Sequence, residues 1–156
     1  MSFSIPSVAI PAMLLQAGGG RHEGEVYVTE RASQHAGHET ALDMLNRPGG
    51  FFPFRPKGGG ARIWLVAKAR TVTLTVPLPE PEDADRHRLS AAKQAALEVT
   101  LADGSTLTGR AMLELPSHQA RILDYLNEAE QFFAIATNEQ LLIVNRAHVL
   151  HVRPED

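Results

Sequence analysis

Two stretches of this chain repeat each other: residues 42–46 read LDMLN, and residues 123–127 read LDYLN. A pair of phenylalanines follows each stretch at the same distance, at residues 51–52 and at residues 132–133. Self-similarity at a regular spacing is typical of a fold that has been copied within one chain. The repeat therefore predicts an internal duplication.

Two further blocks extend the repeat in the same order. Residues 24–30 align with residues 109–115, and residues 63–74 align with residues 141–152. The residues that are identical in the two copies are, in pairs, Gly24 and Gly109, Leu42 and Leu123, Asp43 and Asp124, Leu45 and Leu126, Asn46 and Asn127, Phe51 and Phe132, Phe52 and Phe133, Val66 and Val144, and Ala69 and Ala147. The gaps fall in polar or glycine-rich segments, which are typical of loops.

Alternating apolar and polar residues predict strands. Residues 71–76 read TVTLTV, so Val72, Leu74 and Val76 share one face and the threonines form a wet face. At the corresponding place in the second copy, we expect Leu150 and Val152 to point inward and His151 outward.

A tight hairpin is expected between residues 97 and 108, which read LEVTLADGSTLT. The Asp103-Gly104 pair tolerates the positive φ angles of such a turn. In the first copy, Gly18-Gly19-Gly20 stands where that turn would be.

These patterns predict a mainly β protein. Each copy contains about five short strands and one short helical insertion over the LDxLN block, a pattern typical of an Sm/SH3-like small barrel or a strongly bent sheet. We expect the first repeat in residues 1–79 and a linker plus the second repeat in residues 80–156. The linker begins acidic and proline-rich, and residues 82–96 are expected to turn helical.

The layout resembles the Sm-like small barrel. The resemblance rests on the hairpin at residues 97–109, on the segment that contains Asp124 and Asn127, and on the late bend at residues 145–147. The Sm pattern places its Asp and Asn one residue further apart, in a loop that binds uridines, and its bend carries Arg-Gly where this chain has Arg146-Ala147. The resemblance therefore implies a fold and does not extend the family's RNA-binding residues to this chain. The chain is also similar to two-copy bacterial proteins of unknown function with LNxxxxFF blocks.

Composition narrows the classes of function. The chain has 156 residues and a net charge of −3, so nonspecific attraction to polyanions is not expected. It has no cysteine, which excludes disulfides, thiolate metal sites and cysteine catalysis. Pro6, Pro11 and Gly18 interrupt the first apolar run, so neither a signal peptide nor a membrane span is expected and the cytoplasm is the default location.

The polar residues that both copies keep are Asp43, Asn46, Asp124 and Asn127. One interpretation makes them two equivalent ligand sites. The alternative, which we favour, is structural: leucines at i and i+3 (Leu42/Leu45 and Leu123/Leu126) anchor a short helix on the core, and the Asp and Asn side chains bond main-chain groups at its ends.

Histidines gather in one loop of the first copy. His35 and His38, with Glu39 beside them and His22 upstream, have a His-x-x-His spacing that suits zinc or nickel. A solvated polar loop is the simpler interpretation. No metal or other cofactor is therefore predicted.

A continuous apolar run recurs near the end of each copy. If Ile63/Leu65 and Leu141/Ile143 face the core, Trp64, Val66, Leu142 and Val144 point outward and form an interface. Cover by a helix of the same chain is an equal alternative.

Two functional hypotheses remain. No nucleophile, acid and base fall in a recognisable catalytic pattern, so the leading hypothesis is a non-catalytic protein-interaction or assembly module that binds a protein partner or itself. The alternative is an Sm-like RNA-binding protein, which is not favoured because of the acidic net charge. Its basic strip would comprise Arg62, Lys68, Arg70, Arg146 and Arg153, and its stacking residues would be Phe51, Phe52, Phe132 and Phe133.

Overall fold

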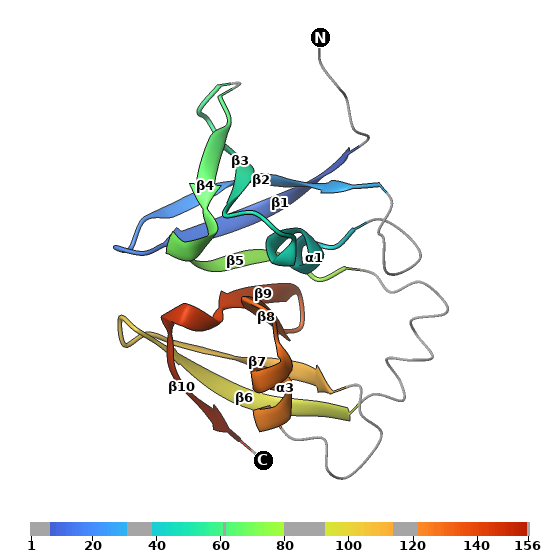
Figure 1. The fold of residues 1–156 in the computed structure, drawn as a ribbon, viewed down its shortest axis with the longest axis vertical. Helices are drawn as coiled ribbons and strands as arrows, with labels where there is room; N and C mark the ends of the chain where they lie inside the picture. The colour runs from blue at the N-terminus through green and yellow to red at the C-terminus, as the bar shows by residue number, and fades with distance from the viewer. Residues whose placement is uncertain (1–6, 31–38, 61, 80–92, 114–121, 156) are drawn as a thin grey trace. The chain divides into compact units, whose positions relative to one another are not determined.

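The computed structural model describes residues 7–30, 39–60, 62–79, 93–113 and 122–155. The chain is mainly β, as expected, and divides into two compact units, Met1–Val76 (unit 1) and Pro77–Asp156 (unit 2). Figure 1 draws unit 1 in blue to green and unit 2 in yellow to red. The sequence places the junction near residue 80, and the structure divides the chain between Val76 and Pro77.

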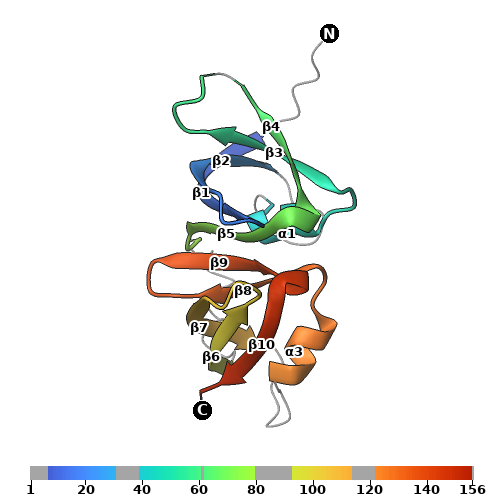
Figure 2. The same cartoon turned by 90° about the vertical axis from the view of Figure 1, so that its left-hand side faces the viewer.

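Unit 1 is an antiparallel sheet with one short helix. Its elements are β1 (Ser7–Gln16), β2 (Arg21–Thr29), α1 (Ala41–Asn46), β3 (Phe51–Pro56), β4 (Trp64–Ala67), the 3-10 helix η1 (Lys68–Arg70) and β5 (Thr71–Pro77). Hydrogen bonding gives the strand order β5-β1-β2-β3-β4. The order is open, because β4 and β5 are not paired with each other, and Figure 2 shows that the sheet is strongly bent.

Unit 2 has the same elements in the same sequence. They are β6 (Lys93–Leu101), β7 (Thr106–Leu113), α3 (Ile122–Glu128), β8 (Phe132–Ala136), β9 (Gln140–Asn145), the 3-10 helix η2 (Arg146–His148) and β10 (Val149–Pro154). The strand order, β10-β6-β7-β8-β9, matches that of unit 1 strand for strand. The helix predicted over residues 82–96 is wrong at residues 93–96, which belong to β6, and the rest of it lies outside the described residues.

The first hairpin of each unit closes with the same main-chain hydrogen bonds. In unit 1, Gln16 N donates to Gly20 O at 2.8 Å, and in unit 2, Leu101 N donates to Ser105 O at 2.8 Å. Gly104 has a φ of 89°, which suits the predicted Asp-Gly turn. The turn predicted at residues 97–108 and the one predicted at the three glycines are therefore both present.

A second pair of hydrogen bonds ties each hairpin to the 3-10 helix. Ala17 N donates to Arg70 O, and Ala102 N donates to His148 O, each at 2.8 Å. The two acceptors, Arg70 and His148, are partners within the aligned blocks 63–74 and 141–152, and the two donors are partners when the alignment of residues 24–30 with 109–115 is continued toward the N-terminus. The same loop therefore contacts the same bend in both units.

The core of each unit lies on one face of its sheet. The largest fully buried side chains of unit 1 are Leu14, Met44, Leu45, Phe52, Phe54 and Leu74. On the same face of the unit 2 sheet, Leu97, Val99, Leu101, Ala111, Phe133 and Ile135 are buried. Burial of each large side chain contributes roughly 1.5–3 kcal/mol relative to exposure.

The alternation predicted for strand β5 is confirmed on one face of the strand. Val72, Leu74 and Val76 are buried, as expected. The wet face predicted for the threonines is wrong at Thr71 and Thr73, which are also buried. The Thr71 hydroxyl donates to the last carbonyl of β4 at 3.0 Å, so it needs no water to satisfy it.

The inward direction predicted for Leu150 is wrong, because this side chain is 61% exposed. Val149 and His151 pair with Leu101 and Thr100, which are consecutive, so Leu150 is the extra residue of a β-bulge. An inserted residue reverses the alternation of faces at that point. His151 is exposed, as predicted.

The helix residues that approach the core share positions one, four and five of each helix. In α1 they are buried, namely Ala41, Met44 and Leu45. In α3 they are half-buried, namely Ile122, Tyr125 and Leu126. The second position lies about 100° around the helix from the first. The anchoring role predicted for Leu123 is therefore wrong, since it is 62% exposed, and Leu42 is half-buried.

We predict that Gly24→Ala lowers the free energy of unfolding by about 1–3 kcal/mol. The added methyl group would meet the carbonyl oxygen of Arg55 and lie 2.7 Å from Cζ of Phe54. Gly109→Ala should cost less, because the nearest atom, Ala136 O, would be 3.0 Å away. Urea unfolding of the two variants measures the difference.

Gly50→Ala is the matched control for this pair. No heavy atom lies within 4 Å of a methyl group added there, so stability should change by less than about 0.5 kcal/mol. A Gly24→Ala variant as stable as the Gly50→Ala variant would contradict the close approach of β2 and β3.

Candidate functional site

Asp43 caps the helix of unit 1. The Thr40 hydroxyl accepts a hydrogen bond from Asp43 N at 3.1 Å, and the Asp43 carboxylate accepts one from Thr40 N at 3.1 Å. This reciprocal capping box satisfies two main-chain donors at the start of α1. The structural interpretation therefore accounts for Asp43.

The other three repeated polar residues occupy matching helix positions. Asn46 is the last residue of α1 and half-buried, and Asn127 lies near the end of α3 and is exposed. Asp124, in the first turn of α3, is half-buried. Residues 114–121, which precede α3, lie outside the described residues. A ligand at these positions stays a prediction.

A basic side chain from each 3-10 helix binds the end of the short α-helix in the same unit. Lys68 Nζ donates to Arg47 O at 2.8 Å, and Arg146 Nη1 donates to Leu126 O and Ala129 O at 3.0 and 2.6 Å. The last carbonyls of a helix lack partners within the helix and carry partial negative charge, so a cation there stabilises it. We refer to Lys68 and Arg146 as the helix clamps.

Lys68 belongs to a buried polar cluster. Its side chain is buried, and Glu39, also buried, accepts a hydrogen bond from Thr29 N at 3.2 Å and pairs with Arg47 at 3.0 Å. Burial lowers the pKa of Lys68, and the nearby Arg47 lowers it further while Glu39 opposes the shift. The cluster holds the approach to α1 in place.

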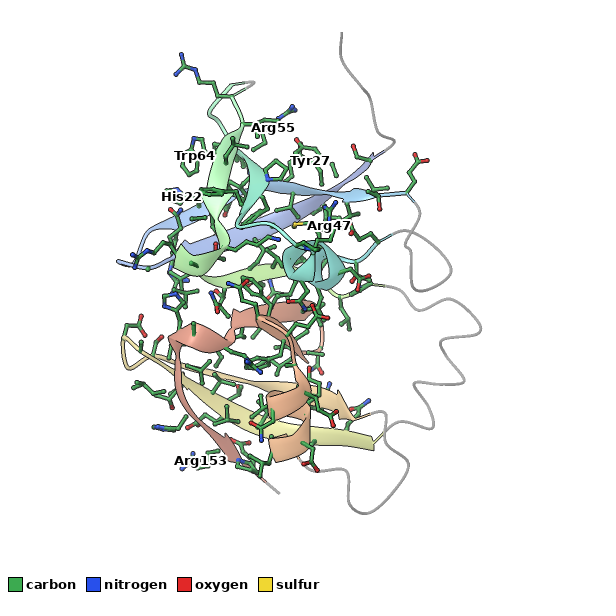
Figure 3. All side chains as sticks on the ribbon, viewed as in Figure 1. His22, Tyr27, Arg47, Arg55, Trp64 and Arg153 are labelled. Atoms are coloured by element: carbon green, nitrogen blue, oxygen red, sulfur yellow. The ribbon has the colours of Figure 1, made fainter. Side chains whose placement is uncertain are left out.

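Two candidates of the metal hypothesis make other contacts in the structure. Glu39 serves the cluster just described, and His22 lies against Trp64, with their rings edge to face at 4.8 Å (Figure 3). His35 and His38 lie outside the described residues. In the part of the chain that the structure describes, no three His, Cys, Asp or Glu side chains come together as a metal site.

The direction of the apolar run in β4 is opposite to the prediction. Val66 pairs with Phe52, and Trp64 with Phe54, so both lie on the core face, where Val66 is 4% exposed. Leu65, predicted to face the core, is instead 73% exposed. Four apolar residues in a row carry no alternation, which is why the sequence did not reveal the phase.

In unit 2 the corresponding pairs follow the same register. Val144 pairs with Phe133 and is fully buried, and Leu142 pairs with Ile135 and is half-buried. Neither residue points away from the core, so the outward direction predicted for them is also wrong. Ile143, predicted inward, is buried although it lies on the opposite face.

The apolar side chains that do point outward form a surface on unit 1. It consists of Phe51, Pro53, Ile63 and Leu65, which we name the β3–β4 outer face. Phe51 is 65% and Ile63 44% exposed, and Pro53 pairs with Leu65 across the hairpin. Sequence reasoning placed Ile63 and Leu65 in the core and assigned Phe51 to base stacking in the RNA-binding alternative.

Polar side chains of β2 and β3 border this face. The Arg55 guanidinium lies 5.7 Å above the Tyr27 ring, and the Tyr27 hydroxyl donates to Glu25 at 3.0 Å (Figure 3). Burial raises the pKa of Tyr27, and the hydrogen bond to Glu25 raises it further. The border is therefore an ordered polar rim next to an apolar patch, an arrangement common at protein interfaces.

Comparison of the chain with protein-family models, with curated proteins and with solved structures finds no match.

Within the described residues, no helix has both the length and the apolar character needed to cross a bilayer.

We predict that Lys68→Met lowers the free energy of unfolding by about 1–3 kcal/mol, since it leaves a carbonyl at the end of α1 without its donor. Arg146→Met should cost less, because the Arg146 side chain is exposed and water replaces its bonds. Thermal unfolding followed by circular dichroism measures both changes.

Lys57→Met is the control, because the Lys57 side chain is 79% exposed and pairs at the surface with Glu23 at 3.7 Å. If all three substitutions had the same effect, the clamp role of Lys68 would be disproved.

Proposed function

We propose that the chain is a non-catalytic protein-interaction or assembly module built from two copies of one small Sm/SH3-like β unit. The duplication is supported by the identical strand orders, by the matching turn hydrogen bonds, and by β3–β4 and β8–β9 pairings in the same register. Each unit has five strands, with an α-helix after the second strand and a 3-10 helix before the last. This order of elements supports the resemblance to the small barrel.

The observation that carries the proposal is the exposure of the β3–β4 outer face. Phe51 and Leu65 are 65% and 73% exposed, whereas their counterparts in unit 2, Phe132 and Ile143, are 1% and 0% exposed. Contiguous apolar surface of this kind is typical of a site that another macromolecule covers.

The energy available at this face is substantial. Because Phe51 and Leu65 are 65% and 73% exposed, completing their burial would contribute roughly 2–4 kcal/mol, at about 1.5–3 kcal/mol for a fully exposed side chain. A micromolar dissociation constant corresponds to about 8 kcal/mol. Two side chains would therefore supply a large share of a moderate affinity, before the costs of association are subtracted.

RNA binding is the second candidate, and one observation favours it. Exposed Phe51 and partly exposed Trp64 lie on the unit that has an excess of basic residues. Against it, the clamp contacts occupy Lys68 and Arg146, and Phe52, Phe132 and Phe133 are buried. Most of the stacking residues predicted for RNA are thus inside the protein.

The double variant Phe51→Ser/Leu65→Ser tests the proposed function. We expect its melting temperature to equal or exceed that of the wild type, because both side chains are exposed. We also expect it not to bind a protein that the wild-type chain binds. Co-purification followed by rebinding of purified components, whether a second copy of this chain or another protein, measures this loss. Retention of the same proteins by wild type and variant would refute the proposal.

For RNA, we expect no binding of a single-stranded oligonucleotide below about 100 µM at roughly 150 mM salt. A gel-shift titration at two salt concentrations measures it. Micromolar binding that weakens steeply with salt would establish the second candidate instead.

A further inference from the structure

We infer that strand β4 of one copy of the chain pairs with strand β10 of a second copy, so that the protein self-associates head to tail. This inference rests on the proposed function and names the partner: a second copy of the same chain. It follows from two strands that each have one hydrogen-bonded neighbour, from exposed leucines on both, and from opposite charge on the two units.

Strand β4 is an edge without the usual protection. Its neighbour in the strand order is β3, and its four residues, Trp64–Ala67, read WLVA. Natural sheets protect such edges with lysines, prolines or bulges, because unpaired N–H and C=O groups attract another strand. β4 carries none of these devices, and Leu65 on its outer side is 73% exposed.

Strand β10 is the corresponding edge of unit 2. Its neighbour is β6, and the bulge leaves Leu150 61% exposed. The strand spans six residues, Val149–Pro154, and its single proline is the last of them. A four-residue strand such as β4 therefore finds enough ladder positions on β10.

Exposure also distinguishes these two edge strands from β5 and β9. Most of β5 is buried, and Ile143, Val144 and Asn145 of β9 are fully buried. Among the described strands, β4 and β10 each have one hydrogen-bonded neighbour and an apolar side chain that is more than half exposed, Leu65 on β4 and Leu150 on β10.

Charge favours a contact between different units. Residues 1–76 contain eight Lys and Arg against five Asp and Glu, and residues 77–156 contain seven against thirteen. Unit 1 of one copy and unit 2 of the next therefore attract each other at long range. A pairing of β4 with β4 would instead bring together two units of net positive charge.

A contact between two different surfaces leaves one of each free at the ends of the assembly. Such heterologous contacts continue until a ring closes or a filament grows. The wild-type chain is thus expected to exceed a dimer in mass.

Leu65→Lys and Leu150→Lys each add a charge to one edge and leave the other intact. Wild-type protein should show a concentration-dependent mass in sedimentation, and either variant alone should be monomeric, with at least a tenfold higher dissociation constant. An equimolar mixture of the two variants should form a one-to-one dimer and nothing larger, because β4 of the Leu150→Lys chain meets β10 of the Leu65→Lys chain.

Leu123→Lys is the matched control, since Leu123 is 62% exposed and lies on neither edge strand. It should keep the wild-type mass. If a lysine variant fails to fold, as judged by circular dichroism, the variants Leu65→Ser and Leu150→Ser replace the lysine variants in the same experiment.

Three results would overturn the inference: a monomeric wild type at about 100 µM, a Leu150→Lys chain that associates like the wild type, or a mixture of the variants that stays monomeric. The second result would indicate β4–β4 pairing. If the wild type is monomeric but still binds a different protein through Phe51 and Leu65, the head-to-tail assembly fails and the proposed function stands.

Discussion

The register of the antiparallel pairing between β3 and β4 is the constraint on which the rest of unit 1 depends. Because Phe52 pairs with Val66 and Phe54 with Trp64, one face of the hairpin closes the core. The same pairing sends Phe51 and Leu65 to the other face, where both are exposed. Side chains alternate along a strand, so a slip of one residue would exchange these two sets and open the core to water.

The helix clamps show how a polar contact supports that arrangement. Lys68 and Arg146 follow the strands β4 and β9, and each reaches the carbonyl end of its helix. Each clamp therefore links the end of the hairpin to the end of α1 or α3 through charge-assisted hydrogen bonds. The RNA-binding alternative placed Lys68 on a basic surface strip. In the structure Lys68 is buried inside the unit, with little access to solvent.

Local patterns predicted the elements well, and they failed where the pattern itself was ambiguous. The Asp-Gly hairpin, the short helices over the LDxLN blocks and the inward residues of β5 follow from turn chemistry and alternation. The phase of β4 did not follow, because residues 63–66 are all apolar. Leu150 was misassigned because a bulge changes the alternation without leaving a local sign, and Asp43 was assigned two roles because a capping aspartate and a ligand look alike in sequence.

The amino-acid sequence by itself determined the mainly β class and the order of the elements in each half, and it predicted the repeat, because these depend on residue spacing along the chain. Only the tertiary structure decided which apolar side chains are buried and which are exposed, since that depends on what packs against each face of the sheet. For this reason Phe51 and Phe132, identical in the two copies, differ in exposure, at 65% and 1%. Sequence identity specifies what a side chain is, and packing specifies whether it is available to another molecule.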